Sequence, residues 1–287
     1  MTAGAVLTVL LLCGCSNPFL LDGVEHTQAG SADSQTVQPT GSAEQPEQTS
    51  EPTETEPESE EPEQTEPEQE EPEPLPLEGK IVCLDAGHGI TSASKSERVS
   101  PLSDETKPAY VSGASGIYQT EEELNLAVAK LVKIRLEKRG AKVVMTRETS
   151  EATVSNIERA QIANEANADL CIRIHADGTE ESSAHGISTL IPAGNLLGSP
   201  EIIEPSREAA ECIQRALVEE TGAQDRGLVE RSDLTGFNWS EVPVVLVEMG
   251  FLSNPEEDQK LSTEAYRKQV ADGIADGAQE WLSAQSE

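Results

Sequence analysis

The sequence predicts an α/β domain in which a largely parallel sheet is covered by helices on both faces. Short apolar segments typical of strands alternate along the chain with segments whose apolar residues recur at helical spacing. Several strand segments are apolar throughout, as expected when both faces of a sheet are buried. The alternation occupies residues 79–287, a length that suits one domain with a single core.

Five segments are predicted to be strands because they are short, rich in aliphatic or β-branched residues, and bounded by glycine or polar residues. The last of them, VPVVLVE, is apolar until its final carboxylate. The predicted strands are residues 80–86, 141–147, 168–174, 186–192 and 242–248.

Four segments are predicted to be helices. In the first, Leu124, Val128 and Leu131 recur at helical spacing and Gly140 ends the segment. The connection 89–120 is long, and loops of that length are usually functional or mobile. The predicted helices are residues 121–139, 155–167, 204–221 and 263–282.

Residues 1–15 are predicted to be an export signal. Residues 3–13 form an apolar run with the length of a signal-peptide core, too short to span a bilayer. The following Cys15 ends the sequence Leu-Cys-Gly-Cys, which resembles a bacterial lipobox and implies a lipidated cysteine at the mature N-terminus. No Lys or Arg precedes the apolar run, which departs from the usual signal pattern.

Residues 16–78 are predicted to be a disordered tether. From residue 44 onward this segment repeats a Glu-Pro unit without aromatic residues, so it lacks the apolar surface needed to offset its ordering entropy. The whole chain has 53 acidic and 20 basic residues, for a net charge of −33. A chain this acidic is not expected to bind nucleic acid or to dock electrostatically on an anionic membrane.

Candidate functional residues lie where predicted strands and helices meet one edge of the sheet. His88 follows the strand 80–86, His175 follows the strand 168–174, and Glu248 closes the strand 242–248. Ligands of open α/β sheets bind beyond the carboxyl ends of the strands. Glu121 opens the helix 121–139 at the same edge.

Two histidines and one glutamate form a known catalytic zinc set, in which water takes the open fourth position. A further carboxylate nearby can accept a proton from that water. Each residue also has an ordinary explanation: histidines occur in loops, and the run Glu121-Glu122-Glu123 suits the first turn of any helix. Glu248 follows five apolar residues, where an unpaired carboxylate is costly unless it is functional.

The segments IVCLDAGHG, EEELNLAVAKL, DLCIRIHADG and VVLVEMGFLSN together resemble the zinc-dependent N-acetylmuramoyl-L-alanine amidases of bacterial cell-wall hydrolysis. The resemblance covers nearly all of residues 80–287 and implies a mixed sheet of about six strands. It implies one Zn²⁺ ion bound by His88, Glu121 and His175. The family's glutamate ligand lies four residues before an Asn-Leu pair, here Asn125-Leu126, which selects Glu121 over its acidic neighbours. It implies Glu248 as the catalytic base.

This resemblance implies cleavage of the amide bond between the lactyl group of N-acetylmuramic acid and L-alanine of the stem peptide. The expected partner is peptidoglycan, and the expected location is extracytoplasmic, at the outer face of the membrane through lipid on Cys15. An activating protein partner cannot be named from these motifs. Arg173 and Asp177 replace the usual Ser and Asn near His175, and Asp177 could change the local charge or engage Arg173.

Two other functions remain compatible with these residues. A zinc peptidase acting on stem peptides or other exported peptides could use the same ligands. A non-catalytic surface protein that binds muropeptides would not need Glu248 as a base, which disfavours that alternative.

Overall fold

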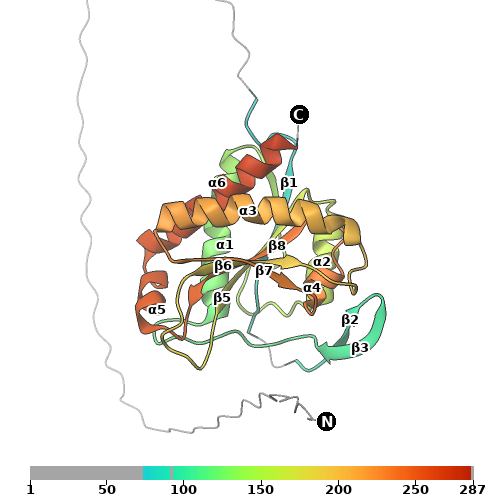
Figure 1. The fold of residues 1–287 in the computed structure, drawn as a ribbon, viewed down its shortest axis with the longest axis horizontal. Coiled ribbons are helices and arrows are strands. Elements are labelled where there is room, and N and C mark those ends of the chain that lie inside the picture. Colours follow the sequence, from blue (N-terminus) through green and yellow to red (C-terminus); the bar gives the residue numbers. More distant parts are fainter. Residues whose placement is uncertain (1–73, 91–92, 286–287) are drawn as a thin grey trace, which may run out of the picture. The chain divides into compact units, whose positions relative to one another are not determined.

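A computed structural model describes residues 74–90 and 93–285 (Figure 1). The predicted signal with Cys15, and the predicted tether up to residue 73, lie outside the described residues. The last five residues of the predicted tether, 74–78, instead belong to the domain, because Leu77 is buried in its core and its backbone N donates to Arg139 O at 2.9 Å. Within the described part of the chain, no helix is both long and apolar enough to cross a membrane.

A mixed sheet of six strands forms the centre of the domain, in the order β4-β1-β5-β8-β6-β7. Neighbouring strands are parallel except β6 and β8, which are antiparallel. This confirms the predicted mostly parallel, mixed sheet. The strands are β1 (Ile81–Ala86), β4 (Lys142–Met145), β5 (Leu170–Asp177), β6 (Ile187–Pro192), β7 (Asp225–Arg231) and β8 (Val244–Phe251).

Helices cover both faces of this sheet, as predicted. Alternate residues of one strand point to opposite faces, so Val82 and Leu84 of β1 join one apolar core while Cys83 joins another. The first core is built on α1 (Glu121–Lys138), α3 (Ile203–Thr221) and α6 (Glu264–Ala284). The second is built on α2 (Asn156–Glu165) and α4 (Thr235–Asn238), and the short η1 (Pro200–Ile202) and α5 (Pro255–Leu261) complete the described helices.

The connection 89–120 contains a hairpin that the sequence did not predict. Its strands are β2 (Ser96–Ser100) and β3 (Ser103–Pro108), which pair antiparallel. They are mostly polar, so they carry no apolar alternation. Two side chains at the end of α4 hold the hairpin in place, since Asn238 Nδ2 donates to Val99 O at 3.0 Å and Trp239 Nε1 donates to Arg98 O at 3.1 Å. The edge strand β7 was missed for the same reason, because most of its residues are polar.

Two strands extend further than predicted. His175 lies within β5 and Glu248 within β8, rather than after or at the end of each strand. The reason is that β5 and β8 pair with each other past these residues, with His175 directly beside Glu248 in the parallel register. The register shifts between His175 and Asp177, which marks an irregularity at this point.

Helices α3 and α6 pack closely because α6 carries two glycines at the contact. A Cβ atom at Gly273 would lie 2.6 Å from Leu217 Cα, and one at Gly277 would lie 2.6 Å from Cys212 O. Real Cβ atoms do not approach backbone atoms this closely, so both positions require glycine for the helices to keep their separation.

Replacing Gly277 by Val should destabilise the domain by about 1–3 kcal/mol, because the added side chain overpacks the α3–α6 contact. Ala265→Val, on an exposed position of α6, is the control and should cost less than ~1 kcal/mol. Urea unfolding of both variants measures the difference. Equal stability of the two variants would contradict the proposed tight contact.

Candidate metal centre and active site

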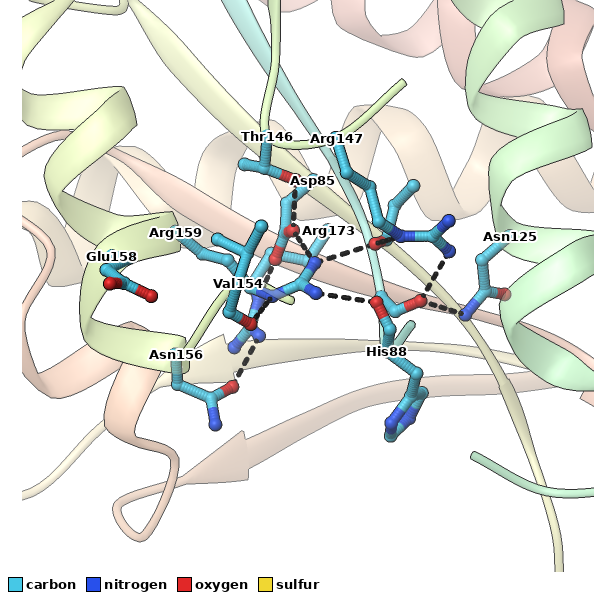
Figure 2. Close-up of polar contacts among 12 residues, drawn as sticks. Asp85, His88, Asn125, Thr146, Arg147, Val154, Asn156, Glu158, Arg159 and Arg173 are labelled. Atoms are coloured by element: carbon cyan, nitrogen blue, oxygen red, sulfur yellow. Dashed lines mark hydrogen bonds and ion pairs between the residues drawn. The ribbon is translucent and has the colours of Figure 1, made fainter. Parts of the chain in front are cut away.

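A buried ion pair network lies at the end of β1. The carboxylate of Asp85 accepts from Arg159 Nη1 at 2.6 Å, from Arg173 Nε at 2.7 Å and from Thr146 Oγ1 at 2.7 Å (Figure 2). Burial alone would raise the pKa of Asp85, but the two guanidinium groups hold that pKa well below its usual range. Asp85 is therefore a charged group inside the protein, compensated by two arginines.

Arginine side chains also bind the backbone that follows Asp85. Arg159 donates to Ala86 O at 2.7 Å and to His88 O at 2.6 Å. Arg147 donates to Ala86 O at 2.8 Å and to Gly87 O at 2.9 Å. These bonds fix three consecutive carbonyl groups, and Figure 2 shows the His88 imidazole pointing away from them. His88 has φ of 58°, a conformation that a non-glycine residue adopts only when its surroundings enforce it.

The structure brings together the three residues predicted as metal ligands. Oε1 of Glu121 lies 3.2 Å from His88 Nε2 and 3.0 Å from His175 Nδ1. One candidate ligand atom from each residue lies within 4.8 Å of the other two. Ligands 2.0–2.2 Å from one tetrahedral ion would be about 3.4 Å apart, so the observed spacing fits a zinc site.

The hydrogen bond made by His88 also favours a bound cation. His88 Nδ1 lies 2.7 Å from the carbonyl oxygen of Val111, which can only accept, so Nδ1 carries the hydrogen. In the neutral ring, Nε2 then presents a lone pair to the Glu121 carboxylate at 3.2 Å. Two lone pairs that close require a proton or a metal ion between them. Fixing the tautomer through the second ring nitrogen is typical of metal-binding histidines.

Glu121 is the buried member of its acidic run, whereas Glu122 is half-buried and Glu123 is exposed. Its Oε2 accepts from Ala114 N at 2.7 Å, and its Oε1 also accepts from Ala176 N at 3.2 Å. Burial alone would raise the pKa of Glu121, but its close contacts with His175 and His88 hold that pKa well below its usual range. Glu121 is therefore ionised, as a metal ligand must be.

His175 is neutral in this arrangement, because burial lowers its pKa to about 4. Its Nε2 is buried and has no hydrogen-bond partner. The ring of His175 packs directly on Gly87, where a Cβ atom would lie 2.6 Å from His175 Nδ1. Glycine at position 87 therefore allows the two histidine-bearing segments to approach each other.

Glu248 lies beside this group without a hydrogen-bond partner for its buried Oε2. Burial raises the pKa of Glu248 well above its usual value, and the negative charges of Glu121 and Asp177 raise it further. A carboxyl group with an elevated pKa and a free oxygen in a cleft is suited to proton transfer.

Both histidines and Glu248 line one cleft with a volume of about 280 Å³. The segment 107–111, at the end of the unpredicted hairpin, also lines this cleft, and no sequence signal marked it. Sequence reasoning also missed Arg159 and Arg231 as lining residues, because their only sequence signal is a charge within an ordinary helix or strand. Arg173 was expected near His175; it lines the cleft, and its charged partner is Asp85 rather than Asp177.

Residues 82–280 match the family described as N-acetylmuramoyl-L-alanine amidase, and the chain belongs to this family. It is 34% identical to YqiI of Bacillus subtilis over 202 residues, which cover 70% of this chain and 84% of YqiI. It is 32% identical to the N-acetylmuramoyl-L-alanine amidase LytC of the same organism, covering 70% of this chain and 35% of LytC. For the probable cell wall amidase LytH of Staphylococcus aureus, identity is 28% and coverage is 73% of this chain and 60% of LytH. The chain thus spans most of YqiI but less than two thirds of LytC and LytH.

Solved structures show the same fold. The N-acetylmuramyl-L-alanine amidase Ami1 of Mycobacterium smegmatis superposes with a TM-score of 0.67 at 27% identity, covering 73% of this chain and 99% of Ami1. The CwlD amidase of Clostridioides difficile, solved in complex with the GerS lipoprotein, gives a TM-score of 0.57 at 26% identity, covering 71% of this chain and 99% of CwlD.

Replacing Asp85 by Asn should lower the free energy of unfolding at pH 7 by about 3–5 kcal/mol, because two buried guanidinium groups lose their counter-charge. The folded pKa of Asp85 lies below its unfolded value of 3.8. Its stabilisation is therefore complete above about pH 4 and declines as the pH falls below that value. The difference in free energy of unfolding between wild type and variant, measured with urea, should therefore shrink as the pH falls from 4 to 3.

Asp276→Asn serves as the control, since Asp276 forms an exposed ion pair with Arg139, and it should cost less than ~1 kcal/mol. If the difference in free energy of unfolding between wild type and Asp85→Asn stays constant down to pH 3, the buried charge does not stabilise the end of β1.

Proposed function

We propose that this chain is a zinc-dependent peptidoglycan hydrolase that cleaves the amide bond between the lactyl group of N-acetylmuramic acid and L-alanine of the stem peptide. The observation that carries the proposal is the convergence of His88, Glu121 and His175 at one point, beside the free carboxyl group of Glu248. Membership of the N-acetylmuramoyl-L-alanine amidase family supports the same bond as the target.

In this proposal His88, Glu121 and His175 hold one zinc ion. Two neutral imidazoles and one carboxylate neutralise part of the ion's charge and leave a position for water or substrate. When bound, zinc would polarise the amide carbonyl and make water nucleophilic at neutral pH. The bonds that Glu121 accepts from Ala114 N and Ala176 N keep its carboxylate oriented toward the histidines.

Glu248 acts as the general base in this proposal. Its carboxylate accepts a proton from the attacking water, and the same group then gives that proton to the leaving nitrogen of L-alanine. Proton delivery is needed because an unprotonated amine anion is a very poor leaving group. The position of Glu248 beside His175 in the sheet holds it next to the metal ligands without a competing hydrogen bond to Oε2.

We further propose that residues 1–15 direct export, that lipid on Cys15 anchors the protein, and that residues 16–73 tether the catalytic domain, whose core already includes Leu77. The peptidoglycan substrate lies outside the cytoplasmic membrane, and LytH is described as a probable cell wall amidase. An anchor with an extended acidic tether would keep the enzyme at the outer face while the domain reaches into the wall.

The other candidates fit the site less well. A zinc peptidase would use the same ligands but cut between amino acids of the stem. A muropeptide-binding protein without activity would have no use for an unpaired carboxyl group beside the metal ligands, and burying one is costly.

Replacing Glu248 by Gln should reduce turnover by roughly 10²–10⁴-fold while zinc stays bound, because only the proton acceptor is lost. The full chain, loaded with zinc, is incubated with isolated peptidoglycan, and products are identified by mass spectrometry. Intact stem peptides with a free N-terminal alanine are expected from the wild type. Glu241→Gln, an exposed position before β8, should behave like the wild type.

Cleavage within the stem would instead support the peptidase. Unchanged release of stem peptides by Glu248→Gln would remove Glu248 from the mechanism.

Removing the metal should abolish the same release. A chelator is expected to stop activity, and added zinc should restore it, because the ligands themselves remain in place. His175→Ala should fail to recover with zinc, since one ligand is missing, and should bind less than one equivalent of zinc by elemental analysis. Full activity after complete chelation would contradict a metal-dependent mechanism.

A further inference from the structure

Cationic side chains outnumber carboxylates in the lining of the cleft, although the protein as a whole is strongly acidic. Its lining contains one carboxylate, Glu248, and four cationic side chains from four different elements of the fold. The formal charge of the whole chain is −33. The cationic residues that line the cleft are Lys107, Arg159, Arg173 and Arg231.

Three of these cations are already engaged. Arg159 and Arg173 both pair with Asp85. Arg231 makes a two-pronged ion pair with Asp233, with both bonds at 2.8 Å. Arg159 and Arg173 share the single carboxylate of Asp85. These three groups together therefore carry a net positive charge beside the cleft.

Lys107 differs from the others because no carboxylate pairs with it among the described contacts. Its Nζ donates one hydrogen bond, to the carbonyl oxygen of Asp233 at 2.8 Å. An ammonium group has three hydrogens, so two donors remain. Burial lowers the pKa of Lys107. The negative charges of Asp233 and Glu97 oppose that shift, and the positive charges of Arg173 and Arg231 add to it. The nearby Glu97 is occupied, since it accepts from Asn156 Nδ2 at 3.0 Å and from Ile157 N at 3.1 Å.

Lys107 also has a fixed position. It lies in β3, and the hairpin is held by bonds to Val99 and Arg98. The chain runs from Lys107 along the cleft wall to Val111, whose carbonyl orients His88. The ammonium group and the candidate metal ligands are therefore parts of one preorganised cleft.

The two halves of the proposed substrate differ in charge. The muramoyl side of the scissile bond carries hydroxyl and amide groups, whereas the peptide side carries carboxylates. We propose that Lys107 binds a carboxylate of the stem peptide and thereby places the peptide half of the substrate in this cleft. This inference rests on the proposed function, because it names the part of the substrate that the same site recognises.

The test compares two probes, N-acetylmuramoyl-L-alanyl-D-glutamate and the diamide made from it, which differ only in carboxylate charge. Binding of each is measured by calorimetry on the zinc-loaded full chain carrying Glu248→Gln, so that no turnover interferes. This parent should bind the carboxylate probe roughly tenfold more tightly, the size of one charge-assisted hydrogen bond. Adding Lys107→Gln should bring the ratio of the two affinities close to one.

Two further variants give the control. Lys107→Arg keeps the charge and should keep much of the preference. Lys130→Gln removes the same charge from an exposed position of α1 outside the cleft and should leave the ratio unchanged. Equal affinity for both probes in the parent, or a preference that survives Lys107→Gln, would overturn the proposal.

The proposed function is judged separately, by whether the wild-type chain releases stem peptides with a free N-terminal alanine from peptidoglycan. If it does, and the ratio is insensitive to Lys107, the carboxylate subsite is wrong and the amidase stands. If it does not, while the ratio still depends on Lys107, the subsite stands and the proposed reaction is wrong.

Discussion

The buried carboxylate of Asp85 is the interaction on which the candidate site depends. It compensates Arg159 and Arg173, and Arg159 in turn binds the carbonyl groups of Ala86 and His88. His88 leaves β1 in a backbone conformation that is unfavourable by itself, at φ of 58°. The fixed carbonyl groups hold the backbone of His88, and the Val111 carbonyl then orients its ring toward Glu121. The charge network thus fixes the backbone after β1 and thereby the position of His88 as a candidate ligand.

The pairing of β5 with β8 supplies the second constraint. It sets His175 next to Glu248 in register, so a candidate ligand and a candidate base are held at a fixed separation by backbone hydrogen bonds. Glu121, the first residue of α1, lies between the two histidines. Three secondary-structure elements and one loop therefore contribute one functional side chain each, which is the usual way an open α/β sheet builds a site.

Most of this could be predicted from the sequence, and the exceptions share a physical cause. The apolar strands and the amphipathic helices follow from the hydrophobic pattern, and the strand ends place His88, His175 and Glu248 at one sheet edge. Glu121 was distinguished from its acidic neighbours only by the family resemblance. The hairpin β2–β3 and the edge strand β7 carry mostly polar residues, so no apolar pattern marks them. The role of Asp85 also escaped prediction, because pairing between an aspartate and arginines distant in sequence depends on the tertiary fold. Lys107 lay in the same unpredicted segment.

In the proposed site two imidazoles and one carboxylate bind a single zinc ion, and X-ray absorption spectroscopy of the zinc-loaded full chain can identify these ligands. We expect one equivalent of zinc whose scattering requires two imidazole rings and otherwise only light oxygen or nitrogen ligands. Substituting His88 should remove one of the two imidazole contributions. Sulfur in the first coordination sphere, or a spectrum unchanged by substitution of His88, would place the metal elsewhere and contradict the account.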